Sequence, residues 1–240
     1  MTKKPVAKVA RKKVARKTAK KPAVRKRRIS PALRNRAARI LWTLDETYPD
    51  SRCSLDHRSA FELLIATMLS AQCTDARVNI VTVDLFRRAR TPRKLADVPI
   101  EELEVLVKST GFFRNKAKNI KATSERIVGE FAGKVPRTMD ELLSLPGVAR
   151  KTANCVLGTA FDDPVGVVVD THVTRIATLL GLTKEKDAVK IEKDLVELLP
   201  QDHWIRFTHQ IIDHGRAVCI ARRPQCQECA LADECPSAKR

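Results

Sequence analysis

The sequence of 240 residues contains no apolar run of about eighteen residues or more, and this argues against a membrane-spanning helix. Its basic N-terminus never gives way to an apolar stretch, so we expect no secretory signal peptide. Strand-like sequence is also scarce, because residues 165–169 form the one such run and are too short to seed a sheet. These absences favour an all-α protein without membrane association.

Acidic residues are missing from the first thirty positions. Residues 1–30 contain fourteen Lys or Arg and no Asp or Glu, whereas the other 210 residues hold 32 basic and 28 acidic side chains. Such a segment cannot bury enough apolar area to offset its ordering entropy, so we expect a disordered basic tail at residues 1–30. Its charge suits contact with nucleic-acid phosphates, and its scarcity of serine disfavours a transit peptide.

A deletion tests the role of this tail. Removing residues 1–30 is expected to weaken DNA affinity and to flatten its dependence on salt, because fewer counterions are released on binding. The catalysed chemistry should be unchanged. Titration of DNA at several salt concentrations measures the slope, and an unchanged slope would contradict the prediction.

The seven cysteines are an odd number and follow no secretory signal, so we expect a reducing compartment, namely the cytoplasm with its nucleoid. Four of them lie within the last 22 residues in the pattern C-x6-C-x2-C-x5-C: Cys219, Cys226, Cys229 and Cys235. Four thiolates this close in sequence suit either tetrahedral zinc or an iron–sulfur cube. The remaining three, Cys53, Cys73 and Cys155, are interpreted as small buried apolar residues.

Apolar residues at helical spacing, separated by Gly and Pro, predict helices along the whole chain. The first begins with a Ser30 N-cap and Pro31. Thr74 or Asp75 caps the third, which runs through Phe86. The first helix continues over residues 32–48, and the remaining predicted ranges are 56–69, 92–97, 100–109, 114–131, 138–144, 150–160, 171–180, 186–199 and 203–217.

The stretch from Leu145 to Lys151 predicts a helix–hairpin–helix motif. A Pro146–Gly147 turn between two helices lets backbone N–H groups approach a phosphate, and the second helix adds its positive dipole. A plain structural turn explains Pro-Gly equally well. Lys151 is either a solvent-facing or phosphate-contacting lysine, or a Schiff-base nucleophile whose charged form is disfavoured by the helix N-terminus and partial desolvation.

Asp170 ends an apolar run and begins a predicted helix, in the segment Val169-Asp170-Thr171-His172. Aspartate is an excellent N-cap, so a structural role alone accounts for it. A carboxylate held in this way at the edge of a cleft also suits proton relay or the stabilisation of positive charge.

Four features resemble the endonuclease III family, in the family's order, over residues 31–236. They are Ser-Ala-Gln-Cys-Thr-Asp at residues 70–75, the hairpin with its lysine, Val-Asp-Thr-His at residues 169–172, and the cysteine spacing. One departure is Ala149, where the family usually has glycine. This change is nearly neutral if residue 149 already begins the helix, and it costs about 1 kcal/mol if φ is positive there.

The resemblance implies two helical lobes around a cleft, namely a six-helix barrel at residues 53–164 and an iron–sulfur domain formed by residues 31–52 and 165–240. It implies a monomeric DNA glycosylase with AP-lyase activity that acts on double-stranded DNA containing a damaged base, an oxidised pyrimidine in this family, or an abasic site. Lys151 and Asp170 would be catalytic, facing each other across the cleft, and the four C-terminal cysteines would hold a [4Fe–4S] cluster. The implied DNA contacts are Gln72, Leu145, Pro146, Gly147, Val148, Ala149, Arg150, Thr171, His172 and a wedge that matches Phe112, although the adjacent Phe113 could take that role instead.

Two alternatives remain at this point. An adenine-mismatch glycosylase shares the cysteine spacing, but it lacks a lysine at the hairpin and carries a large C-terminal domain, whereas this sequence ends five residues after Cys235. A catalytically silent iron–sulfur DNA-binding or sensor protein would use the same tail, hairpin and cluster.

Overall fold

The described part of the protein is helical throughout, as the sequence predicts. A computed structural model describes residues 29–239, so most of the predicted basic tail lies outside the described residues. The α-helices are α1 (Pro31–Thr47), α2 (Ala60–Leu69), α3 (Asp75–Arg88), α4 (Pro92–Ala96), α5 (Ile100–Val107), α6 (Phe113–Glu130), α7 (Met139–Ser144), α8 (Arg150–Ala160), α9 (Thr171–Leu179), α10 (Ala188–Leu198) and α11 (Trp204–Ala217). Short 3-10 turns are η1 (Lys108–Thr110), η2 (Gln201–His203), η3 (Cys226–Glu228) and η4 (Ala232–Glu234). No helix among residues 29–239 is both long and apolar enough to cross a membrane.

Side-chain caps set where several helices begin. The Ser30 hydroxyl accepts a hydrogen bond from the Leu33 N–H, as expected, and Thr74 rather than Asp75 caps α3. The prediction that α2 begins at Asp56 was wrong. Ser59 caps the helix instead, through the Glu62 N–H, and the Glu62 carboxylate reaches back to the Arg58 N–H at 2.7 Å. The first bond satisfies a free N–H of the first turn, and the second ties the residue before the N-cap to that turn, so residues 56–58 stay outside the helix.

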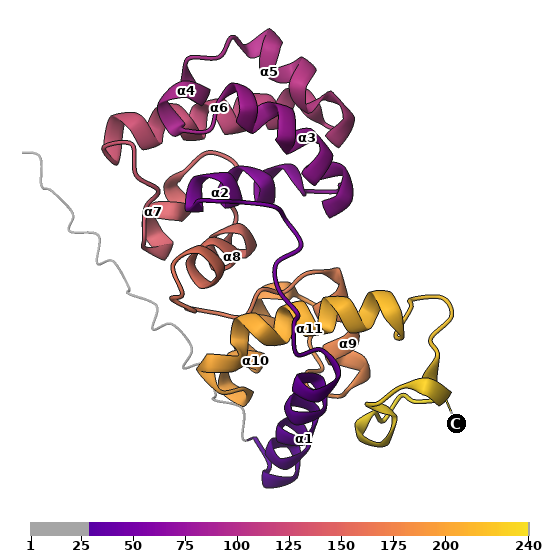
Figure 1. The fold of residues 1–240 in the computed structure, drawn as a ribbon. Helices are drawn as coiled ribbons and strands as arrows, with labels where there is room; N and C mark the ends of the chain where they lie inside the picture. Colours follow the sequence, from indigo (N-terminus) through magenta and orange to yellow (C-terminus); the bar gives the residue numbers. More distant parts are fainter. Residues whose placement is uncertain (1–28, 240) are drawn as a thin grey trace, which may run out of the picture.

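The buried apolar side chains form two separate clusters. One is built mainly from residues 55–157, and the other joins α1 to residues 167–231. Figure 1 shows the corresponding halves, with α2 to α8 in the upper lobe and α1, α9, α10 and α11 in the lower lobe. The predicted boundaries at residues 53 and 165 stay a prediction.

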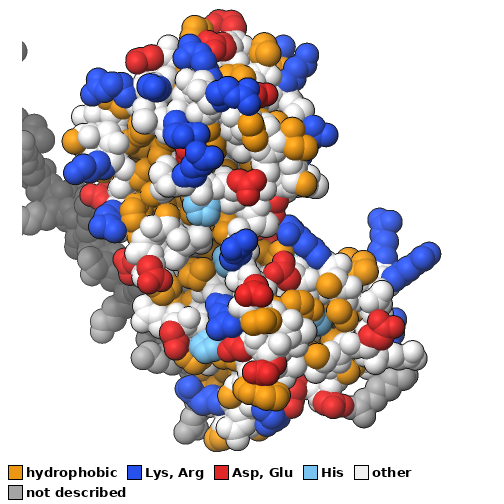
Figure 2. Space-filling view, in the orientation of Figure 1, with side chains coloured by type: hydrophobic (Ala, Val, Ile, Leu, Met, Phe, Trp, Pro, Cys, Tyr) orange, Lys and Arg blue, Asp and Glu red, His pale blue; other side chains and the backbone are white. Residues whose placement is uncertain are grey.

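The two lobes meet at a junction where α11 packs on both α8 and α9. Gly158 of α8 approaches Ile205 of α11 so closely that any Cβ at residue 158 would clash. The Arg150 guanidinium forms two hydrogen bonds to Glu192 of α10, at 2.7 and 2.9 Å. In the space-filling view the surface is hollowed between the lobes, and Lys and Arg side chains lie on either side of the hollow (Figure 2).

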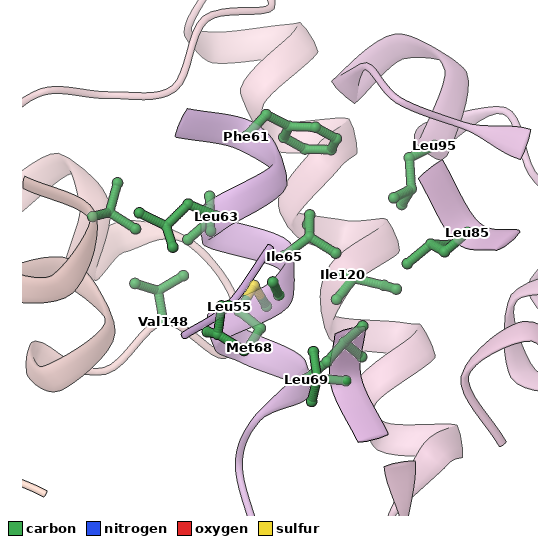
Figure 3. Packing of buried hydrophobic residues seen from close by; sticks show 14 of the residues in the cluster. Leu55, Phe61, Leu63, Ile65, Met68, Leu69, Leu85, Leu95, Ile120 and Val148 are labelled. Carbon is green, nitrogen blue, oxygen red and sulfur yellow. The ribbon is translucent and has the colours of Figure 1, made fainter. Parts of the chain in front are cut away.

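Helix α2 is the centre of the upper lobe. Its residues 61–69 are all buried, which agrees with its nearly continuous apolar sequence. Figure 3 shows Leu63 facing the side where Val148 lies, and Ile65 and Leu69 facing Ile120 and its neighbours. Because α2 is packed on all sides, the segments that leave its C-terminus start from a rigid element.

Candidate active site and nucleic-acid interface

The predicted hairpin joins α7 to α8, and its geometry depends on Gly147. This residue has a φ of +74°, and a Cβ on it would lie 2.8 to 2.9 Å from atoms of the Asn119 side chain. Both conditions require glycine. The side chains of Leu145 and Val148 are buried in the core, and the Pro146 carbonyl accepts a hydrogen bond from Thr123 at 2.7 Å. The side chains of Leu145 and Val148 therefore hold the hairpin, leaving its backbone to meet a ligand.

Ala149 is the N-cap of α8, with φ −95° and ψ 167°. The position does not require positive φ, so the substitution of the family's usual glycine carries no backbone strain. Alanine has no side chain to accept a hydrogen bond, and so it leaves the first N–H groups of α8 uncapped. Free N–H groups and the positive end of a helix dipole, as found here beside Gly147, suit an anion.

Lys151 lies in the first turn of α8, and its side chain is exposed. The structure thus places this lysine at the surface, and its partial desolvation stays a prediction. The charge of Lys151 acts on Asp75 of α3. Burial raises the pKa of Asp75, but hydrogen bonds from Ser54 and Arg216 and the charges of Arg216 and Lys151 lower it. The net effect is a pKa below the usual value. Lys151 therefore lies near Asp75, which forms an ion pair with Arg216 of α11.

Asp170 is the N-cap of α9, as predicted, and its Oδ1 accepts a hydrogen bond from the Val173 N–H at 2.8 Å. Its charge acts on His209 of α11. Burial lowers the pKa of His209, and the carboxylates of Asp213, Asp170 and Asp75 oppose this shift. Since Asp75 interacts electrostatically with both Lys151 and His209, the predicted lysine and aspartate lie around the same junction.

Three other predicted DNA contacts have different surroundings. Thr171 is exposed at the start of α9, whereas His172 is only partly exposed. The His172 ring lies so close to α11 that a Cβ on Gly215 would be 2.6 Å from Nδ1. The Arg150 guanidinium is engaged by Glu192, which is itself 6% exposed and also accepts a hydrogen bond from Asn154 at 2.9 Å. Arg150 thus joins the lobes through its side chain.

The predicted gap-filling residues lie together beside the hairpin. Gln72 and Phe112 are exposed and both have left-handed backbones, with φ values of 54° and 47°. They line one pocket of about 210 Å³ whose wall also includes Asn115, Lys116 and Gly147. Phe113 packs against the buried core, whereas the Phe112 side chain is 67% exposed. Of the two phenylalanines, only Phe112 has the exposure that a wedge requires.

Asp75 is expected to stabilise the junction in a pH-dependent way. The Asp75→Asn variant should lose the Arg216 ion pair, which spans 2.7 Å, and about 1 kcal/mol of unfolding free energy at pH 7. Because the folded-state pKa is lowered, this stabilisation is complete above about pH 5 and is lost as the pH falls below about 4. Urea unfolding of both proteins at pH 7 and pH 3 measures it, and an equal difference at both values would contradict this account.

The four C-terminal cysteines lie around one cavity of about 310 Å³. Cys219 follows α11, Cys226 begins η3, and Cys229 and Cys235 directly follow η3 and η4. None of the four forms a disulfide. Arg175 Nη1 donates to the Cys219 sulfur at 3.4 Å, and His214 Nε2 lies 3.7 Å from the Cys229 sulfur. Within residues 29–239, no three potential metal-binding side chains are grouped closely enough to hold a single ion.

Comparisons with known proteins match this fold and site. The family model of HhH-GPD superfamily base excision DNA repair proteins matches residues 65–201. Endonuclease III of Synechocystis sp. is 56% identical over 204 residues, which are 85% of this chain and 93% of that protein. Endonuclease III of Bacillus subtilis is 46% identical over 193 residues, 80% of this chain and 88% of that protein. A solved structure of a non-covalent endonuclease III–DNA complex matches with a TM-score of 0.81 at 44% identity. The match covers 85% of this chain and 96% of the chain in that complex.

The helical fold, the hairpin and the family match together define a base excision DNA repair protein of the HhH-GPD superfamily. Within that class, the chain belongs to the endonuclease III family of bifunctional DNA glycosylases with AP-lyase activity. This confirms the resemblance and the enzyme class that it implied. It also selects the bifunctional enzyme over the mismatch glycosylase and the non-catalytic sensor.

Sequence reasoning missed several residues that shape this site, namely Asp75, Lys116, Asn119, Glu192, His209 and Arg216. Asp75 could be found only as a competing N-cap, and Lys116 only as one of 46 basic residues. Their importance depends on which helices pack together, and no local pattern carries that information.

Proposed function

We propose that this enzyme excises oxidised pyrimidines from double-stranded DNA and then cleaves the strand at the resulting abasic site through an imine on Lys151. The observation that carries this proposal is an exposed amine in the first turn of an uncapped helix, directly after a hairpin of the kind that binds phosphate. The uncapped N–H groups of α8 and Gly147 would hold the DNA backbone without reading its sequence. Lys151 would then be held next to the bound strand.

The Lys151 amine, when neutral, would attack C1′ of the damaged nucleotide. The bond from C1′ to the base breaks, and the base leaves with the electron pair and takes up a proton. Asp170 would stabilise positive charge on the sugar and relay the proton that the amine loses. Opening of the sugar gives a protonated imine, which makes the C2′ proton acidic. Loss of that proton expels the 3′ phosphate by β-elimination, and hydrolysis of the imine restores the lysine.

The target nucleotide has to leave the duplex before Lys151 reaches C1′, at a cost of a few kcal/mol. Gln72 and Phe112 suit the filling of the gap, because they are exposed, adjacent to the hairpin and held on the same pocket. The amide would occupy the space of the extruded base, and the phenyl ring would enter the opposite strand as a wedge.

The four cysteines are suited to a [4Fe–4S] cluster. All four line one cavity of about 310 Å³, so a group larger than a single ion can be accommodated among them. Cys219, Cys226, Cys229 and Cys235 would hold it. When bound, the cluster would cross-link the C-terminal segment and could transfer electrons. Purified protein should show broad brown absorbance and about four iron atoms per chain, and a colourless zinc protein would overturn this assignment.

A panel of duplexes tests the proposed substrate class. Each duplex carries one defined lesion, such as an oxidised pyrimidine, an oxidised purine, an alkylated base, uracil or an abasic site. Faster release of the oxidised pyrimidines than of the other bases is the expected result. Strand cleavage at the abasic site without release of oxidised pyrimidines would retain the lyase and refute the lesion class. Sedimentation of the protein on a short duplex should show a monomer. Its substrate would be the nucleoid DNA of the cytoplasm.

A further inference from the structure

Lys116 is a buried lysine in the second turn of α6, 7% exposed, in a protein whose lysines are mostly at the surface. Its Nζ donates hydrogen bonds to the carbonyls of Leu69 and Thr110, at 2.8 and 2.7 Å. Burial lowers its pKa, although Cys73 opposes the shift. Within residues 29–239 no carboxylate forms a salt bridge with it. Burying an ammonium without a carboxylate partner is unfavourable, which indicates that its two hydrogen bonds have a structural role.

Both carbonyls belong to the last residue of a helix. Leu69 ends α2, and Thr110 ends η1. The last carbonyls of a helix have no partner within the helix and carry the negative end of its dipole. One ammonium therefore caps two helices that are distant in sequence and ties their C-termini together.

The residues with left-handed backbones at the proposed DNA interface lie two or three positions after these two carbonyls. Gln72 lies three residues after Leu69, with φ 54°. Phe112 lies two residues after Thr110, with φ 47°, and it follows Gly111, whose φ is 72°. A left-handed backbone costs a residue other than glycine about 1–2 kcal/mol and persists only where the surroundings enforce it. Lys116 holds the start of both segments, and it is among the residues that line the same pocket as Gln72 and Phe112.

We propose that Lys116 is a positioning residue, which holds Gln72 and Phe112 at the separation that lets them fill the two strands of one gap. This proposal rests on the proposed function, because the separation of Gln72 and Phe112 matters only if both side chains enter one gap in the duplex. Lys116 touches neither the sugar nor the base. Its effect is confined to steps that need the nucleotide to be extruded from a duplex.

The test compares Lys116→Met with Lys118→Met, which changes an exposed lysine on the same helix. Lys116→Met keeps an unbranched side chain of nearly the same length but leaves both carbonyls without the ammonium. Release of a damaged base from duplex DNA is expected to slow by about 10- to 100-fold, the scale of a small misplacement. Borohydride trapping on single-stranded DNA with an abasic site needs no gap filling and should equal that of the wild type. Lys118→Met should resemble the wild type on both substrates.

A fluorescent 2-aminopurine opposite the lesion reports the insertion of the wedge, and its change on binding should shrink in Lys116→Met. In a Gln72→Ala/Phe112→Ala background, Lys116→Met should add little further loss, because the residues that it positions are gone. An independent, multiplied loss in that background would overturn the proposal, as would an equal loss on single-stranded and duplex DNA by a folded variant.

The conservative Lys116→Arg exchange restores two donors and covers the case in which Lys116→Met does not fold. Because the guanidinium is bulkier than the ammonium, it should displace the two carbonyls and recover only part of the duplex activity, while trapping on single-stranded DNA stays at the wild-type level. A ratio of duplex to single-stranded activity below that of the wild type supports positioning, and an unchanged ratio refutes it. A wild-type enzyme that releases no damaged base and forms no trapped adduct would instead show that the proposed function had failed.

Discussion

The Lys151→Ala variant is expected to form no borohydride-trapped adduct with abasic DNA and to lose at least about 10³-fold in strand cleavage. The amine of Lys151 is the proposed nucleophile, and alanine offers no nitrogen to form the imine. The structure supports a local effect, because the side chain is exposed and its removal leaves no cavity in the core. Gel analysis of the trapped complex measures the adduct directly.

Binding has to be separated from chemistry in this variant. Affinity for a duplex with a tetrahydrofuran residue, a stable analogue of the abasic site, should fall by less than about tenfold, the scale of one lost ionic contact. Lys118→Ala, which removes another exposed lysine, should retain full trapping. An undiminished adduct in Lys151→Ala would show that another amine is the nucleophile.

Asp170→Asn is expected to slow base release by about 10²- to 10⁴-fold with little change in stability. Asparagine caps helices as well as aspartate does, so the hydrogen bond to the Val173 N–H can persist while the negative charge is removed. This variant therefore separates the capping role from the catalytic role, which the sequence left combined. Single-turnover release of a damaged base, together with thermal unfolding, measures both.

Two further variants complete that comparison. Asp170→Ala removes both the cap and the charge, and it should add a loss of about 1 kcal/mol in unfolding free energy to the loss of activity. Asp187 caps α10 through the Lys190 N–H at 3.1 Å, and Asp187→Asn should change neither property. Normal base release by Asp170→Asn would leave Asp170 as a structural cap alone.

The sequence by itself determined the helical class, most helix boundaries and the local chemistry. Ser30 with Pro31, and Asp170 before Val173, are short-range signals, because a cap and its N–H partner lie only three residues apart. The same holds for Gly147, whose turn is local, and for the spacing of the cysteines. Even here the boundary of α2 was missed, because Glu62 bonds to the Arg58 N–H and the helix begins later.

Only the tertiary structure decided which side chains share a surface. Packing chose Phe112 over Phe113 as the exposed ring, directed Arg150 to Glu192, and left Lys151 exposed. It also brought the Lys116 ammonium between two carbonyls that the sequence separates widely. These outcomes depend on contacts between helices that are remote in the chain, and such contacts are set by the burial of whole helix faces, which no short motif specifies.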